Sequence, residues 1–184
     1  MIILPDTPTP SNHTNLDAIR SHSRLTRQSA SFHSLPPTVA TEGDGVLYAM
    51  QGEAAVNVDA DDFGIIGSDD ATTCHILIAV LREGTRKRVV LAHLDTVERV
   101  FRLGQMLEQA ADHCPAVDVY VSGGIGKLND KKGDSERISA AVVAMLSRSP
   151  LSYHLQVFNT CKFMDPRRPR HSLPIIIIII ANPN

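Results

Sequence analysis

Cys74 stands where a nucleophile could act, directly ahead of an apolar segment. The seven residues before it, Gly-Ser-Asp-Asp-Ala-Thr-Thr at positions 67–73, are small, hydroxyl-bearing or acidic, which favours a loop. Residues 75–81 are apolar on both faces and predict a central strand. Most free cysteines are small buried hydrophobes, but a thiol carried by a polar loop to a strand end can meet a partner side chain. Cys74 is therefore the candidate nucleophile.

His93 is the candidate base, on a second apolar strand predicted over residues 88–93. A two-residue turn at Glu83-Gly84 would place Cys74 directly opposite His93, with Cβ atoms about 4.5–5.5 Å apart. A longer loop would shift the pair to a diagonal position, roughly 7–8 Å apart but on the same face. In either register an imidazole can take the thiol proton and generate a nucleophilic thiolate.

His75 is the adjacent alternative, but successive side chains of a strand point to opposite faces. We therefore expect His75 to be buried in the core, hydrogen-bonded and away from the thiol.

The loop ahead of Cys74 supplies the remaining candidates for the site. Ser68 is interpreted either as a third catalytic group that orients His93 or as a plain turn hydroxyl. Asp69 and Asp70 would raise the pKa of a neighbouring thiol, so a cation-binding role suits them better than acid–base work, with loop capping as the alternative. Thr73 is placed with them as a substrate-binding residue, in a turn whose main-chain N–H groups can stabilise an oxyanion.

The elements that must hold these residues alternate between strands and helices. Short strands are predicted at residues 47–50 and 54–58, with further strands at 117–121, 153–158 and 175–180. Asp95 and Glu98 indicate a capping-box-like helix start, and apolar residues recur at helical spacing up to residue 112. A second helix carries its apolar face around residues 138–146. The fold class predicted is α+β, a mixed, largely antiparallel sheet layered with helices.

Composition excludes several classes of function. The formal net charge is −2, and only 4% of the 184 residues are aromatic, with no Trp, so a nucleic-acid partner is not expected. Three cysteines without a CxxC pair argue against a disulfide framework and a zinc site, and we expect neither metal nor cofactor. The longest apolar run, residues 175–180, is far shorter than the roughly 20 residues that span a bilayer, so no membrane association is expected. These features suit a reducing compartment, the cytoplasm and also the nucleus.

Residues 1–45 are rich in Ser, Thr, Pro and His and predict a flexible or loosely docked N-terminal arm. Residues 46–184 would form the core.

The ten residues 67–76, GSDDATTCHI, resemble without a gap the active-site segment of eukaryotic protein N-terminal asparagine amidohydrolases. Weaker similarities flank this motif in the family's order along residues 46–182: Leu47-Tyr48 before it, and His93 with Asp95 and Thr96, Gly123-Gly124 and the final strand after it. The family's nucleophile falls on Cys74. A more distant similarity to bacterial deamidases with a Cys-His core, such as the chemoreceptor glutamine deamidase, implies His93 as base and Ser68 as the third polar member.

The resemblance implies that N-terminal Asn of proteins or peptides is converted to Asp through a cysteine thioester. That product would lead to arginylation and ubiquitin-dependent degradation in the N-degron pathway. Family members continue beyond residue 184, so the core is expected to be C-terminally incomplete. Two alternatives stay open: a catalytically incomplete paralogue acting as a binding protein, and a Cys-His glutamine deamidase.

Overall fold

A computed structural model describes residues 1–6, 15–34, 45–69, 71, 73–111, 114, 116–124, 133–160 and 176–178. The main sheet has six strands in the order β1-β8-β7-β5-β6-β3. Their bounds are β1 Ile2–Ile3, β3 Ala54–Asp59, β5 His75–Glu83, β6 Arg86–Leu94, β7 Val117–Gly123 and β8 Tyr153–Thr160. The central β3, β6, β5 and β7 pairings are antiparallel, whereas β8 pairs in parallel with β7 and β1. The predicted α+β class, with a largely antiparallel sheet, is confirmed.

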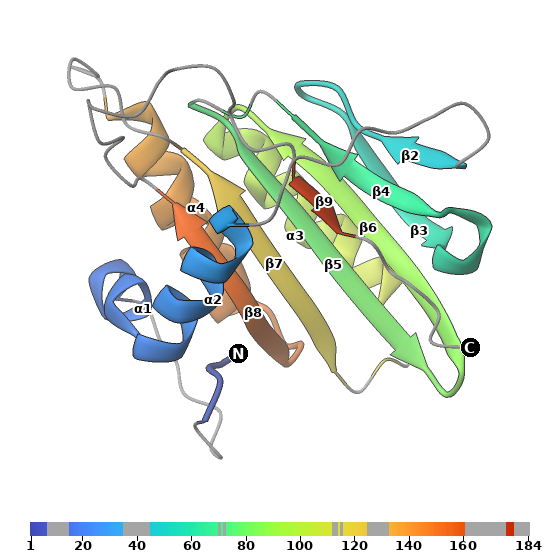
Figure 1. The fold of residues 1–184 in the computed structure, drawn as a ribbon, viewed down its shortest axis with the longest axis horizontal. Helices are drawn as coiled ribbons and strands as arrows, with labels where there is room; N and C mark the ends of the chain where they lie inside the picture. Colours follow the sequence, from blue (N-terminus) through green and yellow to red (C-terminus); the bar gives the residue numbers. More distant parts are fainter. Residues whose placement is uncertain are drawn as a thin grey trace.

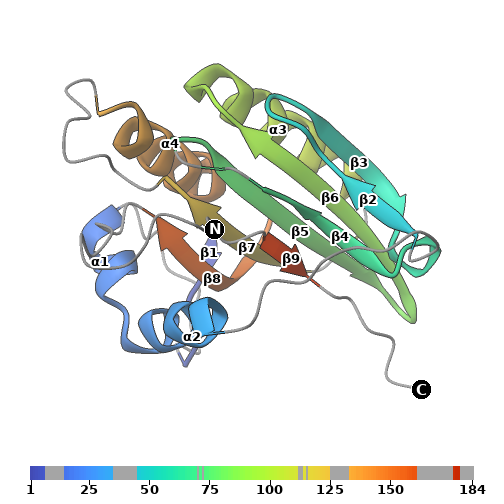
Figure 2. The same ribbon diagram turned by 45° about the horizontal axis from the view of Figure 1, so that its top comes forward.

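A small second sheet lies on one face of the main sheet, and two helices lie on the other (Figures 1 and 2). The small sheet comprises β2 Val46–Tyr48, β4 Ile65–Ser68 and β9 Ile176–Ile178, and a 3-10 turn, Ala60–Asp62, precedes β4. The helices are α3 Val97–Ala110 and α4 Asp134–Arg148. The three layers are thus helices, main sheet and small sheet.

Strand β5 is buried on both faces, which explains why its sequence is apolar over residues 76–81. Leu77, Ala79 and Leu81 belong to the buried cluster shared with α3 and α4, while Ile76 and Ile78 face the other cluster, beneath the small sheet. Because both faces of the strand are covered, both alternating sets of side chains are apolar.

Two local predictions are corrected. The segment before Cys74 was expected to be all loop, but residues 65–68 form β4, so Ser68 ends a strand. The N-cap of α3 is Thr96, whose hydroxyl accepts from the Arg99 N–H, one residue later than the start predicted at Asp95.

The segment predicted as a loosely docked arm contributes buried residues to the core from both of its main described stretches, residues 1–6 and 15–34. It contributes β1 and two helices, α1 Leu16–Ser21 and α2 Ser23–Ser34, at the β8 side of the sheet (Figure 1). Ile2, Ile19 and Leu25 are all but fully buried in the main core cluster. The expectation of loose docking is therefore wrong for residues 1–6 and 15–34. The sequence did not predict this docking because the apolar residues of the segment are sparse and match the helical period only weakly.

Candidate active site

Ser68 contacts His93, and Cys74 lies at the same end of the two central strands β5 and β6. Ser68 is the last residue of β4, Cys74 directly precedes β5, and His93 lies one residue before the end of β6. All three residues are buried. Cys74 is a free thiol within the cluster between the two sheets, the face to which the odd-numbered β6 side chains at 89 and 91 also point.

The register between β5 and β6 differs by two residues from the predicted one, in which Cys74 lies directly opposite His93. Glu83 pairs with Arg86, so the turn is Gly84-Thr85, and Gly84 adopts φ +60°. Ile76 therefore faces His93. Cys74, two residues before Ile76, takes the diagonal position. Because the shift is even, the thiol and the imidazole stay on one face, as predicted.

Ser68 determines which nitrogen of His93 carries the proton. The Ser68 hydroxyl donates to the main-chain oxygen of Ala49 at 2.6 Å and lies 2.9 Å from His93 Nδ1. A hydroxyl has one proton, and a carbonyl oxygen can only accept it, so Nδ1–H must donate to Ser68 Oγ. In the neutral ring the lone pair then belongs to Nε2, which makes Nε2 the basic nitrogen.

The connection between β2 and β3 holds the main chain of His93. The His93 N–H donates to Glu53 O at 3.0 Å, and the Gly52 N–H donates to His93 O at 2.9 Å. The Glu53 carboxylate in turn accepts from the Met50 N–H at 2.9 Å. Sequence reasoning missed this support, for which Gly52, with φ +81°, was the available signal of a tight turn.

The glycines after β7 hold the main chain of Cys74. The Gly124 N–H donates to Cys74 O at 2.7 Å. A Cβ at Gly123, where φ is +125°, would overlap that same carbonyl oxygen. The glycine pair therefore permits the end of β7 to approach Cys74 closely.

Comparison with known proteins identifies the family of the chain. Residues 37–184 match the model of the family described as protein N-terminal asparagine amidohydrolase. The chain belongs to this family. The proteins of that name from Homo sapiens and Sus scrofa are each 30% identical over 144 residues, and that from Mus musculus is 29% identical over the same length. Each alignment covers 75% of this chain and 45% of the relative, so the chain spans about half the length of the curated relatives it matches.

Two of the three residues predicted to bind substrate, Asp69 and Thr73, lie within the part of the chain that the structure describes. Asp69 is partly buried, and its carboxylate accepts from the Tyr48 hydroxyl of β2. Thr73 is partly buried, with Oγ1 4.0 Å from Cys74 Sγ. Asp70 lies outside the described residues. Of these residues, Thr73 has a hydroxyl close to the thiol, whereas Asp69 is oriented by Tyr48.

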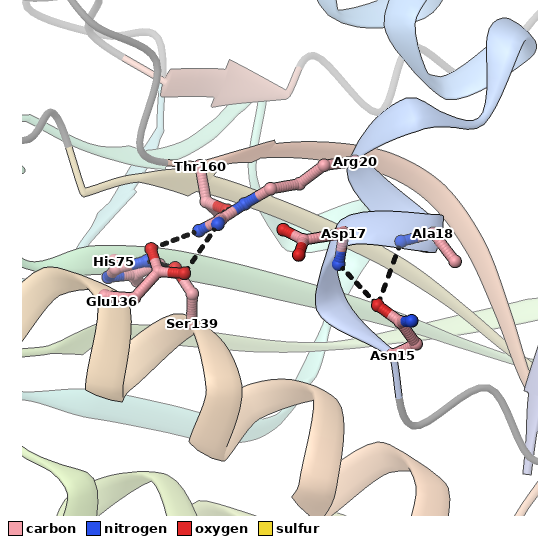
Figure 3. Close-up of polar contacts among 8 residues, drawn as sticks. All are labelled: Asn15, Asp17, Ala18, Arg20, His75, Glu136, Ser139 and Thr160. Carbon is pink, nitrogen blue, oxygen red and sulfur yellow. Dashed lines mark hydrogen bonds and ion pairs between the residues drawn. The ribbon is translucent and has the colours of Figure 1, made fainter.

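His75 points to the opposite face, as predicted, where its Nε2 lies 2.7 Å from Ser139 Oγ of α4 (Figure 3). The ring is fully buried, and desolvation, followed by the charge of Arg20, lowers its pKa to about 3. His75 is therefore neutral near pH 7 and too weakly basic to activate the thiol.

Across the described ranges, no group of three His, Cys, Asp or Glu side chains is arranged to hold a metal ion. The same residues include no helix long and apolar enough to span a bilayer.

Proposed function

We propose that this chain hydrolyses the side-chain carboxamide of an N-terminal asparagine in proteins or peptides, giving aspartate and ammonia. The observation that carries the proposal is the hydrogen-bond pair at Ser68, which presents His93 with its basic Nε2 on the face it shares with Cys74. The family to which the chain belongs supports the choice of substrate.

In the first half of the reaction, His93 Nε2 takes the proton of Cys74, and the thiolate attacks the carboxamide carbon. The tetrahedral intermediate collapses as the C–N bond breaks, and the imidazolium returns its proton to the leaving nitrogen, which departs as ammonia. In the second half, Nε2 takes a proton from water, and the hydroxide attacks the thioester. The C–S bond then breaks and the imidazolium returns its proton to Sγ, which restores the cysteine and the neutral histidine and releases the side chain as a carboxyl group that ionises to aspartate.

Recognition of the free α-amino group is assigned to the carboxylates ahead of Cys74. Asp69 is held by Tyr48 and can accept an ammonium, with Asp70 as its neighbour in sequence and Thr73 as a further substrate contact. Placing the ammonium and the carbonyl at fixed points selects asparagine over glutamine, whose extra methylene displaces the carbonyl by more than about 1 Å. The product suits the N-degron route to ubiquitin-dependent degradation, in the cytoplasm and nucleus.

The test measures ammonia release by the purified chain from peptides beginning with Asn, acetyl-Asn or Gln, and from a peptide with internal Asn. We expect turnover of the Asn-first peptide, with the Gln-first peptide slower on the order of 10²-fold. Equal rates on free and acetylated peptides would contradict ammonium recognition. Preference for Gln-first or internal residues would indicate another deamidase, and binding without turnover would indicate an inactive paralogue.

Cys74→Ser should abolish turnover because a hydroxyl ionises far less readily than a thiol. Cys114→Ser is the matched control: Cys114 is also a buried free thiol, but it lies before β7, at the opposite end of the sheet. Full activity in Cys74→Ser would eliminate the mechanism.

A further inference from the structure

His75 is a costly residue for its position. Its side chain is fully buried on the helix-covered face of β5, and among the described residues its Nδ1 has no hydrogen-bond partner. A buried polar atom without a partner costs about 1–3 kcal/mol, a penalty that an apolar residue of similar size would avoid. A feature of this kind, directly after the candidate nucleophile, calls for a reason beyond packing.

The His75 imidazole packs against the main chain that follows β7. A Cβ at Gly124, where φ is +66°, would lie 2.6 Å from His75 Nε2 and 2.5 Å from Cε1, so the Gly124 backbone is in close contact with the ring. The same glycine donates its N–H to Cys74 O at 2.7 Å. The Cβ added at Gly124 would also overlap Ser135 Oγ, so the His75 ring and Ser135 of α4 together limit how closely Gly124 approaches, and Gly124 in turn binds the carbonyl oxygen of Cys74.

The ring is itself fixed by α4. Its Nε2 lies 2.7 Å from Ser139 Oγ, and one turn earlier on α4 the Glu136 carboxylate accepts two bonds from Arg20 of α1, at 2.8 and 2.9 Å (Figure 3). Arg20 also donates to Thr160 Oγ1 of β8 at 3.3 Å. The first turns of α4 are thus tied to α1 and, through it, to the sheet.

We propose that His75 is a positioning residue for Cys74. Held by Ser139 and packed against Gly124, it fixes the main chain of Cys74 from the far side of the sheet, so that the thiol keeps its place relative to His93. The inference rests on the proposed function for its kinetic consequence, but it makes a separate statement about the chemical reactivity of the Cys74 thiol.

The test compares His75→Leu, His75→Gln and Ser139→Ala, with Ser147→Ala as the matched control. Leucine fills the site without reaching Ser139, whereas the glutamine amide nitrogen can take the place of Nε2. Ser147 lies on the same helix as Ser139, but its hydroxyl donates within the helix to Val143 O at 2.7 Å. Each variant is measured for kcat and KM on an Asn-first peptide and for unfolding by denaturant. The rate of Cys74 alkylation against pH is followed by peptide mapping, with buried Cys114 as the internal reference.

We expect His75→Leu to lower kcat on the order of 10²-fold with little change in KM, because a displacement of about 1 Å can have that effect. The midpoint of Cys74 alkylation should move to higher pH, because the displaced thiol loses its interaction with the His93 imidazole. The resistance of the variant to denaturant should not be reduced. His75→Gln should restore most of the rate. Ser139→Ala should follow His75→Leu in direction, and Ser147→Ala should match the parent protein.

An unchanged kcat and alkylation profile in His75→Leu would overturn the proposal. If that variant does not fold, parent-like behaviour of Ser139→Ala, or failure of His75→Gln to retain the parent alkylation profile, overturns it instead. An inactive parent protein would count against the amidase function alone, since the alkylation profiles still decide whether His75 positions Cys74.

Discussion

The Ser68 side chain shows how one hydroxyl can decide the chemistry of a ring. By giving its own proton to Ala49 O, it leaves only lone pairs for His93 Nδ1–H. The imidazole is thereby held in the tautomer with a basic Nε2. The interpretation of Ser68 as the orienting group rather than a plain turn hydroxyl remains a proposal, now with a definite geometric basis.

Ser68→Ala removes the acceptor of a buried N–H, which costs about 1–3 kcal/mol. If that penalty falls on the productive state of His93, kcat should drop by roughly 10- to 100-fold with KM nearly unchanged. Steady-state kinetics on an Asn-first peptide measure this. Ser149→Ala is the control, because Ser149 is a buried serine that accepts from the Tyr153 hydroxyl at 3.1 Å and lies beyond the C-terminus of α4. A parent-like kcat for Ser68→Ala would show that Ser68 does not orient the base.

His75 also gives the fold a defined pH dependence. Burial lowers its pKa from 6.5 to about 3, so between these values the unfolded chain binds a proton that the folded chain does not. The free energy of unfolding therefore rises with pH across this range: the contribution is present above pH 6.5 and is lost as the pH falls. One proton corresponds to a slope of about 1.4 kcal/mol per pH unit.

His75→Gln removes this titration while keeping an amide group that can hydrogen-bond to Ser139. Urea unfolding at pH 7.0, 6.0 and 5.0 should show the parent protein losing more stability than the variant, with the difference growing towards low pH. Parallel curves for the two proteins would mean that the imidazole is not kept neutral in the folded state.

At the scale of elements, the β5–β6 hairpin positions His93, the proposed base. Its turn has a left-handed residue, Gly84, at the first central position and a negative φ at Thr85, as in type II′ turns. This turn fits the right-handed twist of the strands and sets the pairing of Ile76 with His93.

Gly84→Ala should destabilise the protein by about 1 kcal/mol, because alanine disfavours a φ of +60°. Nothing lies within 4 Å of the added Cβ, so the loss would come from the backbone conformation and not from a steric clash. Gly84→Asn, which tolerates the left-handed region, should lose less. Denaturant unfolding measures both changes. A loss in Gly84→Asn as large as in Gly84→Ala would show that the conformation of this residue is not what the turn requires.

At the scale of the whole molecule, the candidate site depends on three layers that come together at one end of the central strands β5 and β6. The small sheet brings Ser68 over β6, the main sheet carries Cys74 and His93, and α4 supports His75 from behind. The N-terminal segment closes the β8 side of the sheet and lies almost wholly outside the residues 37–184 that match the family. Its buried residues make it part of the same core.

Ile19→Ala tests whether that segment unfolds together with the core. Ile19 is fully buried in α1, so truncation should lower the global free energy of unfolding by about 2–5 kcal/mol. The exposed Ala30 of α2 provides a control, and Ala30→Ser should stay within about 0.5 kcal/mol. If Ile19→Ala left the main unfolding transition unchanged, the segment would be docked independently of the core.

Local patterns in the sequence determined the central strands and the shared face of the thiol and the imidazole. Residues 75–81 are apolar on both faces, and the alternation of side chains has a period of two. Any even slip in register therefore leaves Cys74 and His93 together and His75 apart, which is why the prediction of faces held although the predicted turn was off by one residue. The ten-residue motif around Cys74 likewise indicated the family without any structure.

Only the tertiary structure decided which distant groups support the site. His93 meets Ser68 25 residues earlier, and His75 meets Ser139 64 residues later. Neither contact can be predicted from the periodicity of the neighbouring sequence, because each depends on how one layer of the fold packs against another. The same reason explains the N-terminal segment: its few apolar residues give no strong periodic signal, and their burial arises only when α1 and β1 pack against β8.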